Sequence, residues 1–238
     1  MDAPEAEPQP QLTYADVAGM LEHAVLAPEA TDSDVRAACE LAREYRIAAV
    51  IVRPCDAEIA VRWLEGSGVA VASVVSYPHG FSTTPAKLYE ARDLLRRGVK
   101  EIDAYASASK MMAREFQFIE TEMQQIATSC REAGASLTVT FPSALLAPDL
   151  KTIACKIVKR VGATYIRVAV DDIAQTHRLC ADRVMVASSK AETLANVLAM
   201  REAGAARVMT LATKQILDAW KAEIAARPTT PGNVPAAT

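Results

Sequence analysis

The chain has 238 residues, of which 51% are hydrophobic and 5% aromatic, and its formal net charge is −3. This slight acidity argues against a nucleic-acid partner, because nucleic-acid-binding proteins normally carry a basic stripe. No apolar run approaches the ~20 residues that a membrane span requires, so we expect no membrane contact. The five cysteines show no close pairing, which is typical of reduced thiols and favours a cytoplasmic protein.

The two ends of the chain have compositions that predict disorder. Residues 1–11 are acidic and proline-bearing, the opposite of the basic and then apolar order of a signal peptide. Residues 228–238 are rich in Pro, Ala and Thr, and such segments bury too little apolar surface to fold. We therefore predict one domain over residues 12–227, although length alone also allows two smaller domains.

Strand and helix signals alternate between these tails, after a short predicted N-terminal helix. Short apolar runs predict eight strands, at Leu21–Leu26, Ile47–Arg53, Val69–Tyr77, Lys100–Ala106, Ser136–Phe141, Ala163–Val170, Arg183–Ala187 and Arg207–Leu211. Their continuous apolar character is typical of parallel strands that are covered on both faces.

Helix signals follow the strands. The capping-box spacing from Thr31 to Asp34 begins a helix that ends near Tyr45, and Thr84-Pro85 begins one that Gly98 ends. The other predicted helices begin near Cys55 or span Met111–Ala133, Asp149–Val161, Asp172–Cys180, Ala191–Ala203 and Lys214–Ala226. Eight such units, with no glycine fingerprint after the first strand, favour a closed (β/α)8 TIM barrel over an open doubly wound sheet.

Charged residues interrupt several of the apolar strands. Arg53, Asp103 and Arg167 lie in the second, fourth and sixth, and Glu22-His23 lies in the first. A charge in a strand is costly unless the strand end opens onto a site or a partner. Because side chains inside a barrel form layers drawn from alternate strands, we expect Arg53, Asp103 and Arg167 to share one layer. Two guanidiniums around one carboxylate would make either an oxyanion site or a buried ion network.

Other candidate ligand contacts lie at the predicted mouth of the barrel. His23 and His79 fall at strand ends, where either could act as an acid or base. Ser188, Ser189 and Lys190 follow the seventh strand, and Lys190 is predicted to open the next helix as a point charge for phosphate. The three scattered histidines lack the carboxylate spacing of a metal site, so we expect neither a metal nor a cofactor.

Several segments resemble the deoxyribose-phosphate aldolase family. They are Leu21–Leu26, Ser76–Gly80, Thr83–Lys87, Lys100–Asp103, Gly162–Ile166 and Leu198–Val208. The similarity continues in order from about residue 12 to residue 225, and it implies an eight-stranded α/β barrel with the ancestry of a carbon–carbon lyase.

The resemblance also implies a changed active centre. The family forms a Schiff base through a lysine on the sixth strand, where this chain has Arg167. A guanidinium stays protonated and cannot form that imine. The family's second lysine, which lowers the pKa of the first by like-charge repulsion, aligns with Val186, and its phosphate-binding glycine pair aligns with Ser189-Lys190. Only Asp103, the proton-transfer carboxylate, matches the core catalytic set.

We therefore predict an aldolase-like barrel that acts on or binds a small oxyanionic or carbonyl compound, such as a carboxylate or phosphorylated ligand. Asp103 would move a proton, while Arg167 and Arg53 would hold negative charge. Two alternatives remain open. The chain is a non-catalytic pseudoaldolase used for ligand sensing or assembly, or it is a genuine aldolase that uses another lysine, of which Lys110 lies nearest. A homodimer is also left open.

Overall fold

In a computed structural model of the chain, residues 11–180 and 185–227 are described, except for the side chains of residues 189 and 190. Its strands are β1 (Leu21–Val25), β2 (Ala49–Val52), β3 (Ala70–Val75), β4 (Glu101–Tyr105), β5 (Ser136–Thr140), β6 (Tyr165–Val168), β7 (Met185–Ala191) and β8 (Ala205–Thr210). They form a closed barrel in chain order, with parallel pairing from β1 to β8 and back to β1. The predicted TIM barrel is confirmed.

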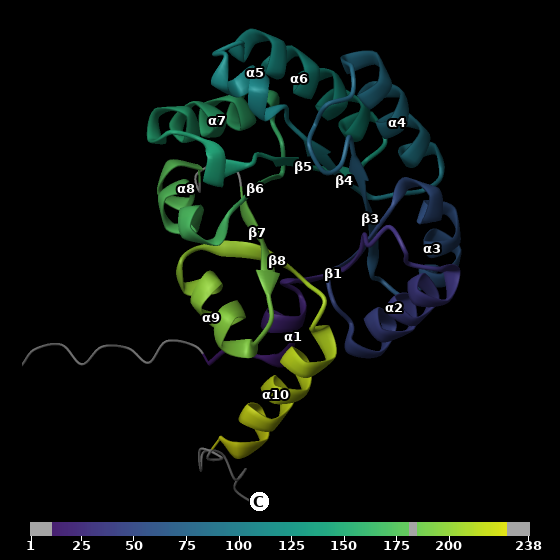
Figure 1. The fold of residues 1–238 in the computed structure, drawn as a ribbon. Coiled ribbons are helices and arrows are strands. Elements are labelled where there is room, and N and C mark those ends of the chain that lie inside the picture. Colours follow the sequence, from purple (N-terminus) through teal and green to yellow (C-terminus); the bar gives the residue numbers. More distant parts are fainter. Residues whose placement is uncertain (1–10, 181–184, 228–238) are drawn as a thin grey trace, which may run out of the picture.

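Helices cover the outside of the barrel (Figure 1). They are α1 (Tyr14–Ala18), α2 (Asp32–Tyr45), α3 (Ala57–Leu64), α4 (Thr84–Arg96), α5 (Ala108–Met112), α6 (Phe116–Glu132), α7 (Pro148–Val161), α8 (Ile173–Cys180), α9 (Leu194–Glu202) and α10 (Thr213–Ala226). The short N-terminal helix α1 begins at a capping box, in which Thr13 and Asp16 satisfy each other's backbone N–H groups. Among the described residues, no helix is long and apolar enough to cross a bilayer.

Two expected boundaries are wrong for local reasons. The strand β2 ends at Val52, so Arg53 lies in the connection that follows it. Pro54, which comes next, has no N–H to donate to a ladder. The expected long helix over 111–133 is divided into α5 and α6, because Arg114 takes a left-handed backbone conformation with φ of 60°.

The seventh strand also lies later in the chain than expected. It continues to Ala191, and the next helix begins only at Leu194, after the N-cap residue Thr193. Lys190 therefore belongs to β7, and the expectation that it opens a helix is wrong. Arg183, the expected start of this strand, lies outside the described residues.

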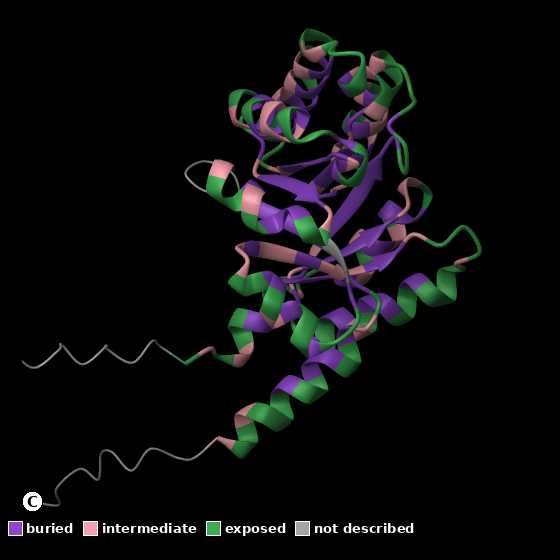
Figure 2. Ribbon diagram, turned by 60° about the vertical axis from the view of Figure 1, so that its left-hand side comes forward, coloured by how far each residue is buried: buried purple, intermediate pink, exposed green. Residues whose placement is uncertain are grey.

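The main apolar core lies between the helices and the outer faces of the strands, and the strands themselves are almost entirely buried (Figure 2). A second, smaller apolar cluster fills the inside of the barrel along β1, β2 and β3. Its members are Ala24, Ala49, Ile51, Ala72 and Val74. The rest of the barrel interior holds charged side chains, which the next section describes.

Candidate functional site

The side chain of Arg167 lies in the middle of the barrel, with 4% of its surface exposed. Its Nε donates to Oδ2 of Asp103 at 2.9 Å, and its Nη2 donates to Oε2 of Glu22 at 2.7 Å. Its Nη1 donates to the backbone carbonyl of Ser188 at 3.0 Å. Each of the three guanidinium nitrogens is thus bonded to the protein itself.

Asp103 is buried and bonded through both carboxylate oxygens. Besides Arg167, it accepts a hydrogen bond of 2.5 Å from the hydroxyl of Thr140 on β5. Burial raises the pKa of Asp103 above its ordinary value, and the positive charge of Arg167 opposes that rise. Burial acts to lower the pKa of Arg167, but the Glu22 and Asp103 carboxylates hold it above its usual range.

The ratio of guanidiniums to carboxylates in this layer is the reverse of the expected one. One guanidinium lies between two carboxylates, so the prediction of two guanidiniums around one carboxylate is wrong. The sequence marked Glu22 as a charge within a strand but gave it no partner. The only signal was that charge, because Glu22 and Arg167 are 145 residues apart and meet only when the barrel closes. We call Glu22, Asp103 and Arg167 the central ion network.

A second polar layer lies beside this network inside the barrel. Arg207 on β8 contacts Glu101 on β4 at 3.4 Å and donates to the hydroxyl of Tyr165 on β6 at 3.2 Å. Burial raises the pKa of Glu101 above its ordinary value, and the positive charge of Arg207 opposes that rise. Sequence reasoning assigned Glu101 and Arg207 no role, although both are charges at strand positions.

Arg53 does not point into the barrel layer. Its Nε donates to Asp56 at 2.7 Å. The remaining guanidinium nitrogens donate to the backbone carbonyls of Ala27, Pro28 and Ala30 at 2.8 to 3.1 Å. The expectation that Arg53 shares a layer with Arg167 is therefore wrong. Its contacts fix the connection between β1 and α2.

His79 lines a small cavity of about 160 Å³ at the ends of β3, β4 and β5. Its ring stacks on that of Phe81, with the centroids 5.1 Å apart. Tyr105 and Thr140 also line this cavity. Because the Thr140 hydroxyl bonds to Asp103, the side chain of Thr140 connects the wall of this cavity to the central ion network.

The residues predicted to follow the seventh strand lie in different environments. Ser188 is buried, and its hydroxyl donates to the carbonyl of Val168 at 3.2 Å. Its own carbonyl holds Arg167. The side chains of Ser189 and Lys190 lie outside the described part of the structure. Val186, which the resemblance aligns with the family's second lysine, is fully buried.

Two described lysines on the helices that follow β3 and β4 are paired. Lys87 is fully buried on α4 and bonds to Glu122 at 2.7 Å and to the carbonyl of Tyr105 at 3.0 Å. Lys110, considered as a replacement amine, contacts Glu115 at 2.7 Å. Each of these two amines thus already has a carboxylate partner.

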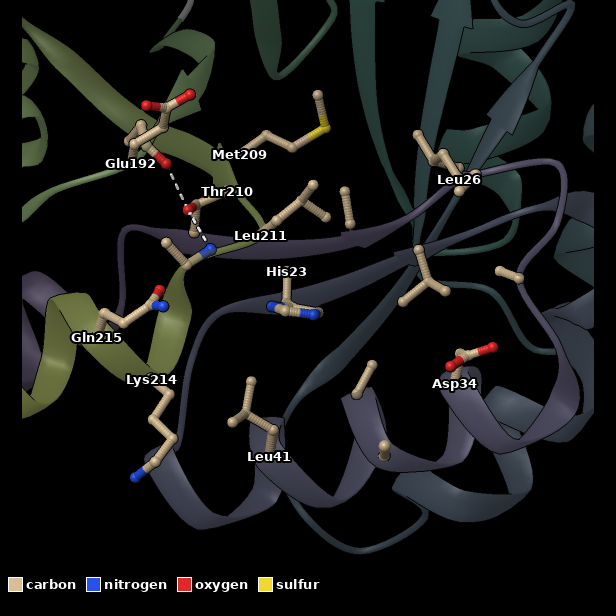
Figure 3. Close-up of a pocket in the computed structure, with 18 of the residues that line it drawn as sticks. His23, Leu26, Asp34, Leu41, Glu192, Met209, Thr210, Leu211, Lys214 and Gln215 are labelled. Atoms are coloured by element: carbon tan, nitrogen blue, oxygen red, sulfur yellow. Dashed lines mark hydrogen bonds between the residues drawn. The ribbon is translucent and has the colours of Figure 1, made fainter.

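A larger cavity of about 1320 Å³ lies at the mouth of the barrel, where the ends of β8 and β1 meet α2 and α10 (Figure 3). His23 lies at its centre, and a hydrogen bond of 2.9 Å joins its Nδ1 to the hydroxyl of Thr213. Burial lowers the pKa of His23 below its ordinary value. The sequence placed His23 at a strand mouth, but nothing in it pointed to this cavity. Within the described ranges, no three His, Cys, Asp or Glu residues are grouped to hold a metal ion.

Comparison with known proteins identifies relatives of this chain, although no family model matches it. The deoxyribose-phosphate aldolase of Bacteroides thetaiotaomicron is 29% identical over 220 residues, which are 88% of this chain and 92% of that protein. The deoxyribose-phosphate aldolase of Treponema denticola is 33% identical over 149 residues, or 62% of this chain and 68% of that protein. This chain belongs to the deoxyribose-phosphate aldolase family.

Solved structures share the fold of this family member at lower identity. The deoxyribose phosphate aldolase of Aeropyrum pernix, a tetramer, superimposes with a TM-score of 0.82 at 21% identity, covering 89% of this chain and 93% of that one. An aldolase named QR15 gives a TM-score of 0.83 at 22% identity, covering 89% of this chain and 99% of its own.

Proposed function

We propose that this member of the deoxyribose-phosphate aldolase family is a pseudoaldolase, which works through binding and forms no Schiff base. The observation that carries the proposal is the bonding of Arg167, whose three guanidinium nitrogens all donate to the protein. A guanidinium cannot supply the neutral amine that an imine requires.

The same bonding argues against Arg167 as a ligand contact. An anionic ligand would have to displace Glu22 or Asp103, which are 2% and 3% exposed. The displaced carboxylate would then be buried without a partner, which typically costs several kcal/mol. Arg167 is better explained as the centre of a structural network than as an anion receptor.

Asp103 is also poorly placed for proton transfer. A general base must come within about 2.6–3.2 Å of the proton that it removes, directly or through one water. Both oxygens of Asp103 are already bonded, one to Thr140 and one to Arg167. The carboxylate that matches the family's catalytic set thus has a structural use.

Schiff-base trapping tests the proposal. The protein is incubated with 2-deoxyribose 5-phosphate or with acetaldehyde, borohydride is added, and the intact mass is measured. We expect no mass increase, while the relative from Bacteroides thetaiotaomicron serves as the parallel control. A stable mass increase would contradict the proposal and favour a genuine aldolase, and peptide mapping would identify the lysine.

A second candidate function is the binding of a small oxyanionic or carbonyl compound in the 160 Å³ cavity. It is favoured by the position of Thr140, which lines the cavity and donates to Asp103. His79 would contact the ligand there, and Ser189 and Lys190 remain proposed phosphate contacts.

Thermal-shift screening of carboxylates and sugar phosphates separates the two candidates. The screen compares the wild type with Thr140→Val, which keeps the side-chain shape but removes the donor, and with Lys190→Met. A melting temperature that rises for the wild type and not for Thr140→Val would favour the second candidate. We expect no compound to give such a difference.

A further inference from the structure

The large cavity is an apolar groove between two helices, and we call it the α2–α10 groove. Its helix walls are formed by Ala37 and Leu41 of α2 and by Lys214 and Gln215 of α10. Leu211, which follows β8 and lines the groove, is 76% exposed. Such an exposed leucine beside a continuous apolar surface is typical of an interaction site.

The size of the groove favours a macromolecular occupant. Its volume of about 1320 Å³ exceeds the roughly 300–1,000 Å³ of clefts that hold small molecules. The groove has α2 on one side and α10 on the other, and it extends over the end of β1 to Leu26 and Met209 at the barrel mouth (Figure 3). Two helices on either side of an apolar floor are suited to receive a third helix.

The charges around the groove are mostly negative. Among the side chains that the structure describes, Glu29, Asp34, Glu192 and Asp218 line it with one cation, Lys214, which Asp218 pairs at 2.8 Å. The described residues include no ion-pair partner for Glu29 or Glu192, so two carboxylates are available to a cationic partner. The hydroxyl and backbone N–H of Thr31 bond to Asp34 and lower its pKa, so that it stays ionised.

The tails of this chain complement these charges poorly. Residues 1–10 contain three acidic residues, Asp2, Glu5 and Glu7, and no lysine or arginine. Residues 228–238 contain no lysine or arginine either. A second copy carries the same net charge of −3. A basic partner of another sequence fits the groove better than any part of this protein.

We propose that the α2–α10 groove binds a basic amphipathic helix of a partner protein. Apolar side chains spaced at i, i+3 or i+4 and i+7 would pack on Ala37, Leu41 and Leu211, while flanking lysines or arginines would face Glu29 and Glu192. The proposal goes beyond the loss of Schiff-base chemistry and does not depend on it, because Glu22, Asp103 and Arg167 do not line the groove.

The experiment measures the binding of a fluorescent peptide to the full-length protein. The probe has about 14 residues, or roughly four helical turns, with leucine on one face and lysine on the other. A second peptide carries glutamate in place of every lysine. We expect the lysine peptide alone to bind, with an affinity that falls as salt is raised and with a gain of helical circular dichroism.

Two matched variants locate the site. Ala37 and Ala86 are both exposed alanines on helices, but only Ala37 lines the groove. We expect Ala37→Lys to weaken binding by roughly tenfold or more, about 1.4 kcal/mol, because it places bulk and positive charge in the groove. Ala86→Lys, on α4, should leave the affinity unchanged.

Several results would overturn the proposal. They are the failure of the lysine peptide to bind, equal binding of the glutamate peptide, and equal effects of the two alanine variants. Binding that appears only after deletion of residues 228–238 would make the chain's own tail the occupant. Competition between peptide binding and dimerisation, seen by light scattering, would make it a second copy. None of these outcomes changes the result expected from Schiff-base trapping with borohydride, so the two proposals are tested separately.

Discussion

The barrel interior and the α2–α10 groove share the strand β1, yet they are filled in opposite ways. Glu22 points into the barrel and bonds to Arg167, while the next residue, His23, points outward and bonds to Thr213 on α10. Successive side chains of a strand face opposite sides. The interior is therefore charged and closed, whereas the groove is largely apolar and open.

This difference distinguishes the residues of the central ion network from the residues that line the larger cavity. The family resemblance directs attention to the barrel centre, where the central ion network leaves Arg167 and Asp103 almost completely buried. The large cavity lies outside that centre, beside helices whose residues the resemblance does not assign. Within the described residues, ion pairs thus fill the barrel centre, while the larger cavity lies at the barrel mouth beside α2 and α10.

The largest expected effect comes from opening the central ion network. Arg167→Leu should lower the free energy of unfolding by about 3–5 kcal/mol, because it leaves the buried carboxylates of Glu22 and Asp103 without their cation. Asp103→Ala should cost a similar amount. Arg160→Leu is the control, since Arg160 pairs with Glu120 on the surface and should cost under about 1 kcal/mol. Urea melts in which Arg167→Leu matches the wild type would contradict a structural role.

A smaller effect is expected where the backbone closes the barrel mouth. Gly80 has φ of 70°, and a Cβ there would lie 2.6 Å from the carbonyl oxygen of Tyr105. Gly66 has φ of 68° with nothing within 4 Å. Both alanine variants carry the left-handed cost of about 1–2 kcal/mol, but only Gly80→Ala adds a clash.

The difference between these two glycine variants is therefore the useful quantity. We expect Gly80→Ala to be less stable than Gly66→Ala by a further 1–3 kcal/mol or so, measured by the same urea melts. Equal losses would mean that the loop after β3 moves freely, and that the small cavity at the mouth is less closed than the contacts indicate.

His23 should give the free energy of unfolding a modest pH dependence. Its lowered pKa means that below about 6.5 the unfolded chain takes up a proton that the folded chain resists. Stability should therefore rise with pH between the lowered folded pKa and about 6.5, and fall on acidification through this range. In melting curves across pH, His23→Gln should flatten this component, while His177→Gln, on the exposed side of α8, should preserve it. A His23→Gln profile that parallels the wild type would exclude His23 as the source.

The smallest effect is expected for the apolar side chains that the groove exposes. Leu211→Ser should change the free energy of unfolding by no more than about 0.5 kcal/mol, because that leucine buries little surface on folding. Val208→Ala, three residues earlier on β8 and fully buried, should cost about 2 kcal/mol. Thermal denaturation that shows a large loss for Leu211→Ser would mean that the groove is part of the core rather than an open surface.

Much of the fold follows from local pattern. The apolar runs, the capping box at Thr31 and the glycine after α7 predict the strands and helices because each signal acts within a few residues. A local signal also explains one of the two boundary errors. Pro54 marks the early end of β2, and no simple pattern announces the left-handed conformation of Arg114 that divides α5 from α6.

By itself, the sequence determined that the chain forms a barrel and that Arg167 and Asp103 are unusual charges within it. Only the tertiary structure decided what those charges do. Glu22 reaches Arg167 because β1 and β8 close the barrel. The groove forms where α10, which packs on α1, α9 and α2, meets α2 at the ends of β1 and β8. Local pattern sets which residues are buried, but ring closure and helix packing, which join distant parts of the chain, set their partners.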